Sequence, residues 1–241
     1  MTTLQNDIKL MLEKMFFDFT RKTLIVEFVE DVSTREKEII QELGVEMSST
    51  YDASHYTGCF LPPNDKTSVY TILIQKDRQQ DLYLMTAFHE FQHAILYFHL
   101  YQLIFHEDLQ NLKSNSINAT FQIYSEFSAC KEGTANYIKF VDIEGVTKQM
   151  MGVSLVEQQL DDYKAYLNTS SGYEFLMHFA MIYGTLFGAR DAIENFPFEY
   201  YLKQIEGIEL LEDICSHMDK YTVEFDWFEK FDFLIKDFLD V

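Results

Sequence analysis

The sequence predicts an α+β fold, with a small mixed sheet near the N-terminus and a mostly helical C-terminal half. Two runs rich in β-branched and aromatic residues, Thr23–Val29 and Val69–Gln75, predict strands in the first part of the chain. From Ile117 onward, apolar residues recur at helical spacing. The 241 residues are 47% apolar, which is enough to bury a full core. We therefore expect an α+β subdomain at 1–110 and a helical subdomain at 111–241.

Local patterns predict the N-terminal elements. The spacing of apolar residues predicts a helix over Leu4–Phe19. A second, polar-faced helix is expected over Thr34–Leu43, with Gly44 as its C-cap. The apolar run Cys59–Leu61 is followed by Pro-Pro-Asn-Asp, a turn sequence, and then by Val69–Gln75. This order predicts two strands joined by a turn.

The C-terminal half is predicted to be helical throughout. Three segments have the spacing of helices: Ile117–Val141, Val153–Leu167 and Glu174–Glu194. The acidic and aromatic tail contains a single helical stripe formed by Trp227, Phe231, Leu234 and Phe238. We interpret this stripe as a face that packs in the core or against another subunit.

One pentapeptide of the chain indicates a chemistry: residues 89–93 read HEFQH, which matches HExxH. They lie in an apolar run that predicts a helix from Asp81 to about Phe105. Residues four apart share one face of a helix, so His89 and His93 can reach a single ion. Glu90 lies between them and can hold the water that the ion activates. The apolar surroundings predict a buried helix, in which a divalent cation would satisfy all three polar side chains.

A third ligand is needed, because hydrolytic zinc sites have three protein ligands and one position open to water. The segment Lys131–Ile138, KEGTANYI, resembles the EGxAxY helix that carries the glutamate ligand in gluzincin metallopeptidases. Together with HExxH it forms the resemblance to that family, which extends from Ala87 to Tyr137. The resemblance implies that Glu132 is the third ligand and that Asn136 orients it.

Two other residues compete for the third position. Glu126 precedes Glu132 by six residues, which places it on a different face of the same helix, so only one of them can point at the metal. His99 follows His93 by six residues, as in metzincin proteases. Leu96, however, occupies the position of the metzincin glycine and resists the sharp turn made there. If the helix continues, His99 lies too far along its axis to share the ion.

The resemblance to gluzincins implies a zincin-like fold and a zinc-dependent peptidase, in which a zinc-activated water attacks a peptide bond. His89, His93 and Glu132 would bind Zn²⁺, and Glu90 would be the general base. A non-catalytic metal-binding or regulatory module with the same fold is the alternative function. In that case the metal would be structural or lost.

Further expectations concern the oxyanion and the substrate. A Tyr-Gly pair on a helix after the ligand helix is similar to what several gluzincin-type families carry. It implies that Tyr183 stabilises the oxyanion, with His178 as the alternative. In zincin-like proteases an edge strand beside the active-site helix pairs with extended substrate. Val69–Gln75 is the predicted edge, and the expected partner is a peptide or protein.

Composition limits the other functions. The formal charge of −20 disfavours binding to nucleic acid or to anionic membranes. The three cysteines are widely spaced, which predicts reduced thiols and neither a disulfide framework nor a Cys-zinc site. No apolar run is long enough to span a bilayer, and no signal peptide is visible, so a cytoplasmic protein is expected. Three further histidines show no partner pattern and are interpreted as structural or surface residues: His55, His106 and His217.

Overall fold

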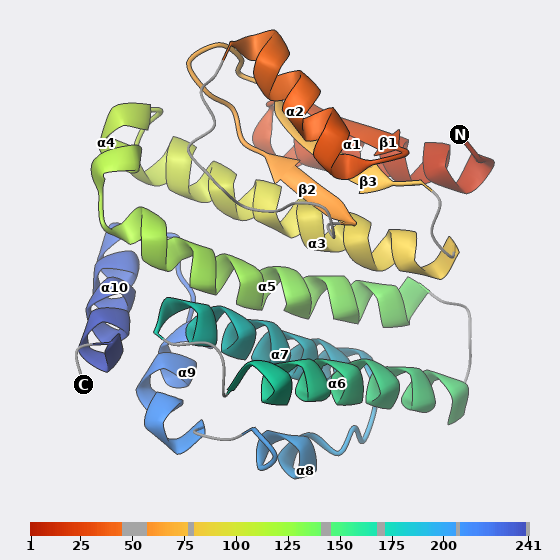
Figure 1. Ribbon diagram of the computed structural model, residues 1–241, viewed down its shortest axis with the longest axis vertical. Coiled ribbons are helices and arrows are strands. Elements are labelled where there is room, and N and C mark those ends of the chain that lie inside the picture. The colour runs from red at the N-terminus through yellow and green to blue at the C-terminus, as the bar shows by residue number, and fades with distance from the viewer. Residues whose placement is uncertain (45–56, 77–79, 141–145, 168–171, 206–207, 240–241) are drawn as a thin grey trace. The chain divides into compact units, whose positions relative to one another are not determined.

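The computed structural model describes residues 1–44, 57–76, 80–140, 146–167, 172–205 and 208–239 (Figure 1). Helices predominate, and the described strands form a single mixed sheet, which confirms the α+β class. The chain divides into two compact units, Met1–Phe98 and His99–Val241. His55 lies outside the described residues.

The first unit contains the sheet and three helices. Its elements in chain order are α1 (Thr3–Thr20), β1 (Leu24–Val29), α2 (Val32–Leu43), β2 (Gly58–Leu61), β3 (Tyr70–Gln75) and α3 (Gln80–Phe98). Local chemistry fixes several of their ends. Thr2 and Gln5 form a capping box at the start of α1, and Asp31 accepts a hydrogen bond from the Thr34 amide at the start of α2. The predicted C-cap Gly44 is confirmed, with a left-handed φ of 63°.

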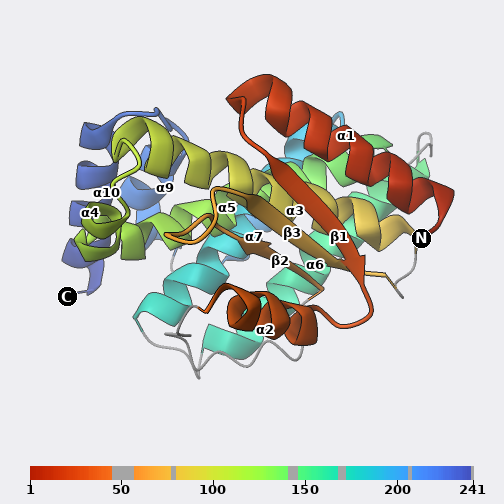
Figure 2. The ribbon, with the colours of Figure 1, turned by 90° about the horizontal axis from the view of Figure 1, so that it is seen from above.

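The strand order of the sheet is β1-β3-β2 (Figure 2). β3 pairs in parallel with β1 and antiparallel with β2. The sequence-based prediction that Val69–Gln75 is an edge strand is therefore wrong, because the strand in that segment is bonded on both sides. The parallel partner was missed since it lies far back in the chain, beyond the reach of turn patterns. The edges of the described sheet are β1 and β2.

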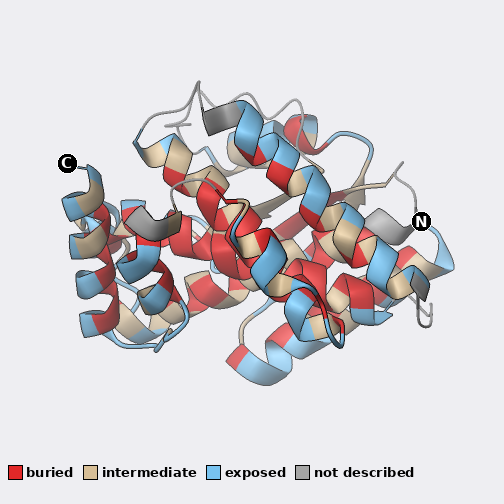
Figure 3. Cartoon of the chain, turned by 90° about the horizontal axis from the view of Figure 1, so that it is seen from below, coloured by how far each residue is buried: buried red, intermediate tan, exposed pale blue. Residues whose placement is uncertain are grey.

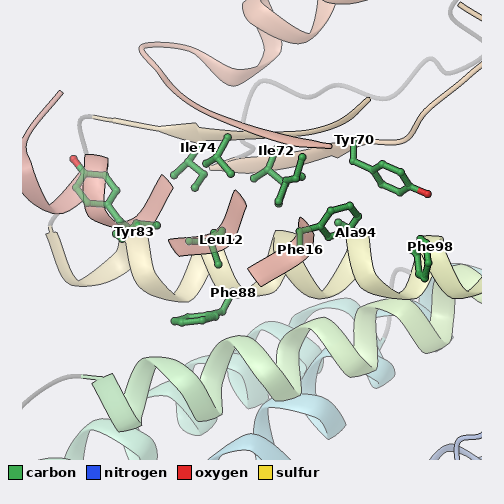
Figure 4. Close-up of a cluster of buried hydrophobic side chains, with 13 residues drawn as sticks. Leu12, Phe16, Tyr70, Ile72, Ile74, Tyr83, Phe88, Ala94 and Phe98 are labelled. Carbon is green, nitrogen blue, oxygen red and sulfur yellow. The ribbon is translucent and has the colours of Figure 1, made fainter. Parts of the chain in front are cut away.

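α1 and α3 cover one face of the sheet, and α2 covers the other. Figure 4 shows Ile72 and Ile74 of β3 facing α3, with Leu12 and Phe16 of α1 between them. The aromatic ring of Phe16 lies 4.8 Å from that of Tyr70, measured between centroids. Alternation along β3 turns Leu73 to the opposite face, where α2 packs and Leu73 is fully buried. The cluster on the first face, which includes residues of α1, β3 and α3, holds α3 against the sheet.

The second unit is helical, as predicted. Its elements are η2, a π-helix (His99–Ile104), α4 (Leu109–Ser114), α5 (Ile117–Phe140), α6 (Val146–Leu167), α7 (Tyr173–Ala192), α8 (Phe198–Leu202), η3, a 3₁₀ turn (Ile208–Leu211), α9 (Glu212–Met218) and α10 (Phe225–Leu239). α5, α6 and α7 lie side by side (Figure 1). The helix predicted from Asp81 to about Phe105 is confirmed in extent, but its last turns widen into η2.

Two glycines bring α7 close to α5. A Cβ at Gly184 would overlap the main-chain oxygen of Phe127, and a Cβ at Gly188 would overlap that of Lys131. Because these positions are four residues apart, they lie on one face of α7. Only a residue without a side chain allows this separation of the two backbones.

α10 is amphipathic, with its exposed and buried positions on different sides (Figure 3). Trp227 and Phe231 of the predicted stripe are buried, and Leu234 and Phe238 are partly buried. Asp232 lies on the buried side and is 8% exposed. Its carboxylate accepts hydrogen bonds from the hydroxyls of Ser116 and Thr120, and Lys236 Nζ lies 2.6 Å from it. The buried acid is thereby satisfied and ties α10 to the start of α5.

Candidate metal site

α3 presents His89, Glu90 and His93 from one continuous helix. Most of its surface is apolar, and Ala87 and Ala94, on either side of the motif, are fully buried. Glu90 itself is only 7% exposed, and the two histidines are half-buried. Polar groups in such surroundings are costly unless they are paired. The helix therefore holds three chemically active side chains where solvent access is restricted.

The two imidazoles meet on one face of α3. Their Nε2 atoms are 3.0 Å apart, and the ring planes are inclined by 81°. Burial lowers the pKa of His89 to about 4. The pKa of His93 is lowered as well, first by burial and then by the neighbouring His89. Both rings are therefore neutral at pH 7, which is the form that binds metal ions.

Glu90 lies against the start of β2. A Cβ built on Gly58 would lie 2.8 Å from both Cγ and Oε1 of Glu90, and it would overlap the methyl group of Thr86. The hydroxyl oxygens of Thr57 and Thr86 are 3.4 Å apart. The strand thus approaches the face of α3 that carries Glu90. No motif pointed to Gly58, because the requirement for glycine comes from a tertiary contact.

The two competing glutamates lie on α5. Burial raises the pKa of Glu126 to about 7, so its carboxylate lies in surroundings that disfavour charge. Glu132 lies near the amide of Asn136, whose Nδ2 donates to the main-chain oxygen of Glu132 at 2.9 Å and to Oε2 at 3.4 Å. The neighbour expected for Glu132 is therefore in place. A cation near Glu126 would offset the cost that burial places on its charged form.

Among the described residues, His89, His93 and Glu126 form a group that could hold a metal ion, each offering one ligand atom. The group contains Glu126, whereas the family resemblance favoured Glu132. The difference arises because EGxAxY is a short pattern, and Glu126 and Glu132 lie on different faces of α5.

His99 has a different neighbour. The helix continues through Leu96, and His99 begins η2, as expected if no metzincin turn is made. Its Nδ1 lies 3.0 Å from the hydroxyl of Tyr221, and the two rings stack. His99 therefore has a structural partner within the second unit. His217 is similar, with Nε2 2.8 Å from the main-chain oxygen of Trp227.

Tyr183 lies in an aromatic cluster of the second unit. It is 4% exposed, and its ring stacks on those of Phe127 and Phe179 at 5.4 Å in each case. Its side chain forms a hydrogen bond with Cys215, and burial raises its pKa. These contacts place Tyr183 in the packed core of the second unit. His178 lies on the same helix, partly buried near Glu174.

The remaining chemical groups offer no second metal cluster in the part of the chain that is described. Cys59, Cys130 and Cys215 form no disulfide with one another. Burial raises the pKa of Cys59 and, to about 12, that of Cys215, so both are protonated at neutral pH. No described helix is long and apolar enough to cross a membrane.

Comparison with protein-family models, curated proteins and solved structures finds no significant match to this chain. Function is therefore inferred from the chemistry of the site residues and not from a relative.

Proposed function

We propose that the protein is a zinc-dependent peptidase of gluzincin type with a zincin-like fold, in which His89, His93 and Glu126 hold the ion. One observation carries the proposal: two half-buried, neutral imidazoles direct their Nε2 atoms to within 3.0 Å of each other, at hydrogen-bond distance. Two nitrogens bound to one tetrahedral zinc ion are about 3.3 Å apart, given Zn–N distances of about 2.0–2.1 Å. The pair therefore needs little rearrangement to bind one ion.

The donor set fits zinc in particular. Two imidazole nitrogens and one carboxylate oxygen are the ligands of one class of catalytic zinc sites, which leave a fourth position open. Glu126 supports this set because burial disfavours its ionised form unless a cation lies nearby. When bound, zinc supplies a Lewis acid that makes water a nucleophile near neutral pH.

Glu90 is the proposed general base. It follows His89 directly on α3, so it lies beside the ligand pair, and it is almost fully buried. Its carboxylate would accept a proton from the attacking water as the new carbon–oxygen bond forms. The same proton would then pass to the leaving nitrogen as the carbon–nitrogen bond breaks. Restricted solvent access strengthens both transfers, since fewer waters compete for the carboxylate.

The substrate is proposed to be an extended peptide that pairs with β2. Cys59 and Leu61 stand opposite Leu73 and Thr71 in hydrogen-bonded register, so the main-chain groups of Gly58 and Phe60 face away from β3. No bond to these outward groups is found among the described residues, apart from a weak 3.8 Å contact of the Cys59 thiol with the Phe60 oxygen.

The other edge of the sheet is less suited to a peptide. On β1, the amide of Val26 donates to Oε1 of Glu13 at 3.0 Å, so a side chain of α1 occupies that edge. β2, in contrast, offers main-chain groups next to Glu90. A peptide added there by strand pairing would run past the proposed base.

The proposal is tested with the conservative change Glu90→Gln. Zinc-loaded wild type and Glu90→Gln are incubated with a mixture of internally quenched fluorescent peptides of varied sequence. The wild type should cleave, and kcat should fall roughly 10²- to 10⁴-fold in the variant, because a positioned base contributes about that much. Zinc content should stay the same, since glutamine leaves both histidines in place.

Two results would count against a peptidase. One is cleavage that survives in Glu90→Gln, which would assign the activity to another site or to a contaminant. The other is a wild type that binds zinc and cleaves none of the peptides, which would favour the metal-binding or regulatory module. His217→Gln serves as a matched control, because it removes a partly buried imidazole outside the proposed ligand set.

A further inference from the structure

Gly58 is held to glycine by space and not by backbone conformation. It opens β2 and has ordinary extended geometry, in contrast to Gly44, whose φ is 63°. Alanine could therefore adopt the same backbone without strain. What excludes alanine is the position of its Cβ, which would be 2.8 Å from Cγ and Oε1 of Glu90 and would overlap Thr86 Cγ2.

The contact joins β2 to the one face of α3 that carries the proposed base. Thr86 and Glu90 are four residues apart, so their side chains lie one above the other on that face. Both are buried, at 7% exposure each. The Thr57 and Thr86 hydroxyls, 3.4 Å apart, bring the chain just before Gly58 to the same place. The main chain of β2 thus forms one wall around the Glu90 side chain.

We propose that Gly58 is a positioning residue for Glu90, and that its missing side chain lets the strand fix where the carboxylate lies. The catalytic part of this statement rests on the proposed peptidase function. A methyl group at residue 58 would displace Glu90, because the helix backbone beneath it is held by the core and the longer side chain is the part that can move.

The variant Gly58→Ala should lower kcat roughly 10- to 100-fold, since a shift of about 1 Å in a catalytic group has effects of that size. Zinc content should equal that of the wild type, because the three atoms nearest the new methyl group belong to Thr86 and Glu90 and not to a histidine. For a single peptide that the wild type cleaves, KM should change much less than kcat, since the outward main-chain groups of β2 are retained.

A second variant separates displacement of Glu90 from crowding of the helix. Gly58→Ala combined with Thr86→Ser removes the methyl group that overlaps the new Cβ and leaves the contact with Glu90. Stability should rise from that of Gly58→Ala alone, while kcat stays low. Gly152→Ala on α6 is the matched control, because its Cβ would overlap only the Cδ1 end of Ile193, the C-cap of α7, and should leave kcat unchanged.

A double-mutant cycle tests the contact without any activity. The free energy of unfolding is measured for wild type, Gly58→Ala, Glu90→Ala and the double variant, all full-length and treated with a chelator. Glu90→Ala removes two of the three atoms that crowd the new methyl group and leaves Thr86 Cγ2, so Gly58→Ala should lower the denaturant midpoint less in that background than in wild type.

The cycle and the kinetics have distinct outcomes. Additive midpoint shifts would overturn the proposal whether or not the wild type cleaves peptides, because Gly58 would then not bear on Glu90. Wild-type kcat in a folded Gly58→Ala variant would overturn it as well. If the wild type cleaves nothing, the peptidase proposal fails, and non-additive shifts still support the positioning of Glu90 by β2.

Discussion

The two units both use glycine for close packing, but what each glycine meets differs. Gly184 and Gly188 of α7 face the main chain of α5, which cannot move out of the way. Gly58 of β2 faces the side chains of Thr86 and Glu90, which can. A side chain at Gly184 or Gly188 should therefore lower the free energy of unfolding. A side chain at Gly58 should instead displace the Glu90 carboxylate and so lower activity.

The units also differ in how they treat buried polar groups. In the second unit, Asp232 is surrounded by two hydroxyls and an ammonium group. In the first unit, burial drives two histidines to their neutral forms, and their nitrogens face each other. Asp232 has its partners supplied by other side chains, whereas the two imidazoles lie at hydrogen-bond distance from each other, an arrangement in which an ion could take the place of the shared proton.

The largest effect on stability is expected for Gly188→Ala. The new Cβ would overlap the Lys131 main-chain oxygen and lie 2.8 Å from Thr134 Cβ, so the helices must separate. The free energy of unfolding should fall by about 2–3 kcal/mol, as in other overpacked cores. Urea unfolding measures the change. A variant as stable as wild type would contradict the expected difference between the glycines of α7 and Gly58. Zinc content per folded chain should not change.

A smaller effect is expected for Asp232→Asn. The amide retains one acceptor oxygen for the Ser116 and Thr120 hydroxyls but loses the charge that attracts Lys236. The free energy of unfolding should fall by about 1 kcal/mol, the usual contribution of a hydrogen bond involving a buried polar group. Thermal unfolding monitored by circular dichroism would show this. A rise in the free energy of unfolding would mean that burying the Asp232 charge costs more than its hydrogen bonds and ion pair contribute.

Lys236→Met provides the control for Asp232. The Lys236 side chain is 52% exposed, so its ion pair is well solvated and contributes little by itself. The change in stability should be smaller than for Asp232→Asn. An equal loss would assign the whole effect to the ion pair and not to the hydroxyl network.

The sequence predicted the parts that depend on local periodicity. The helix of His89 and His93 follows from apolar spacing, and a shared face follows from the four-residue interval. The antiparallel pairing of β2 with β3 was predicted from the turn between them, but the second neighbour of β3 could not be predicted in the same way. Pairing of β1 with β3 is non-local, with Leu24 opposite Tyr70, and no turn pattern encodes it.

Within the site, the sequence could name candidates but not choose among all of them. Glu126 and Glu132 lie on different faces of the same helix, and helical spacing alone does not decide which face carries a ligand. Gly58 carries no motif at all. The need for glycine at this position comes from contacts with Thr86 and Glu90, more than 25 residues later in the chain, and is visible only in the folded structure.

The most direct test of the central claim is the zinc content of the purified protein after exposure to excess Zn²⁺ and gel filtration, measured by mass spectrometry. The wild type and Glu132→Gln should carry one zinc ion per chain, Glu126→Gln should carry much less, and His89→Ala and His93→Ala should carry none. Wild-type protein without zinc, or histidine variants that retain it, would contradict the claim that these two imidazoles bind one ion.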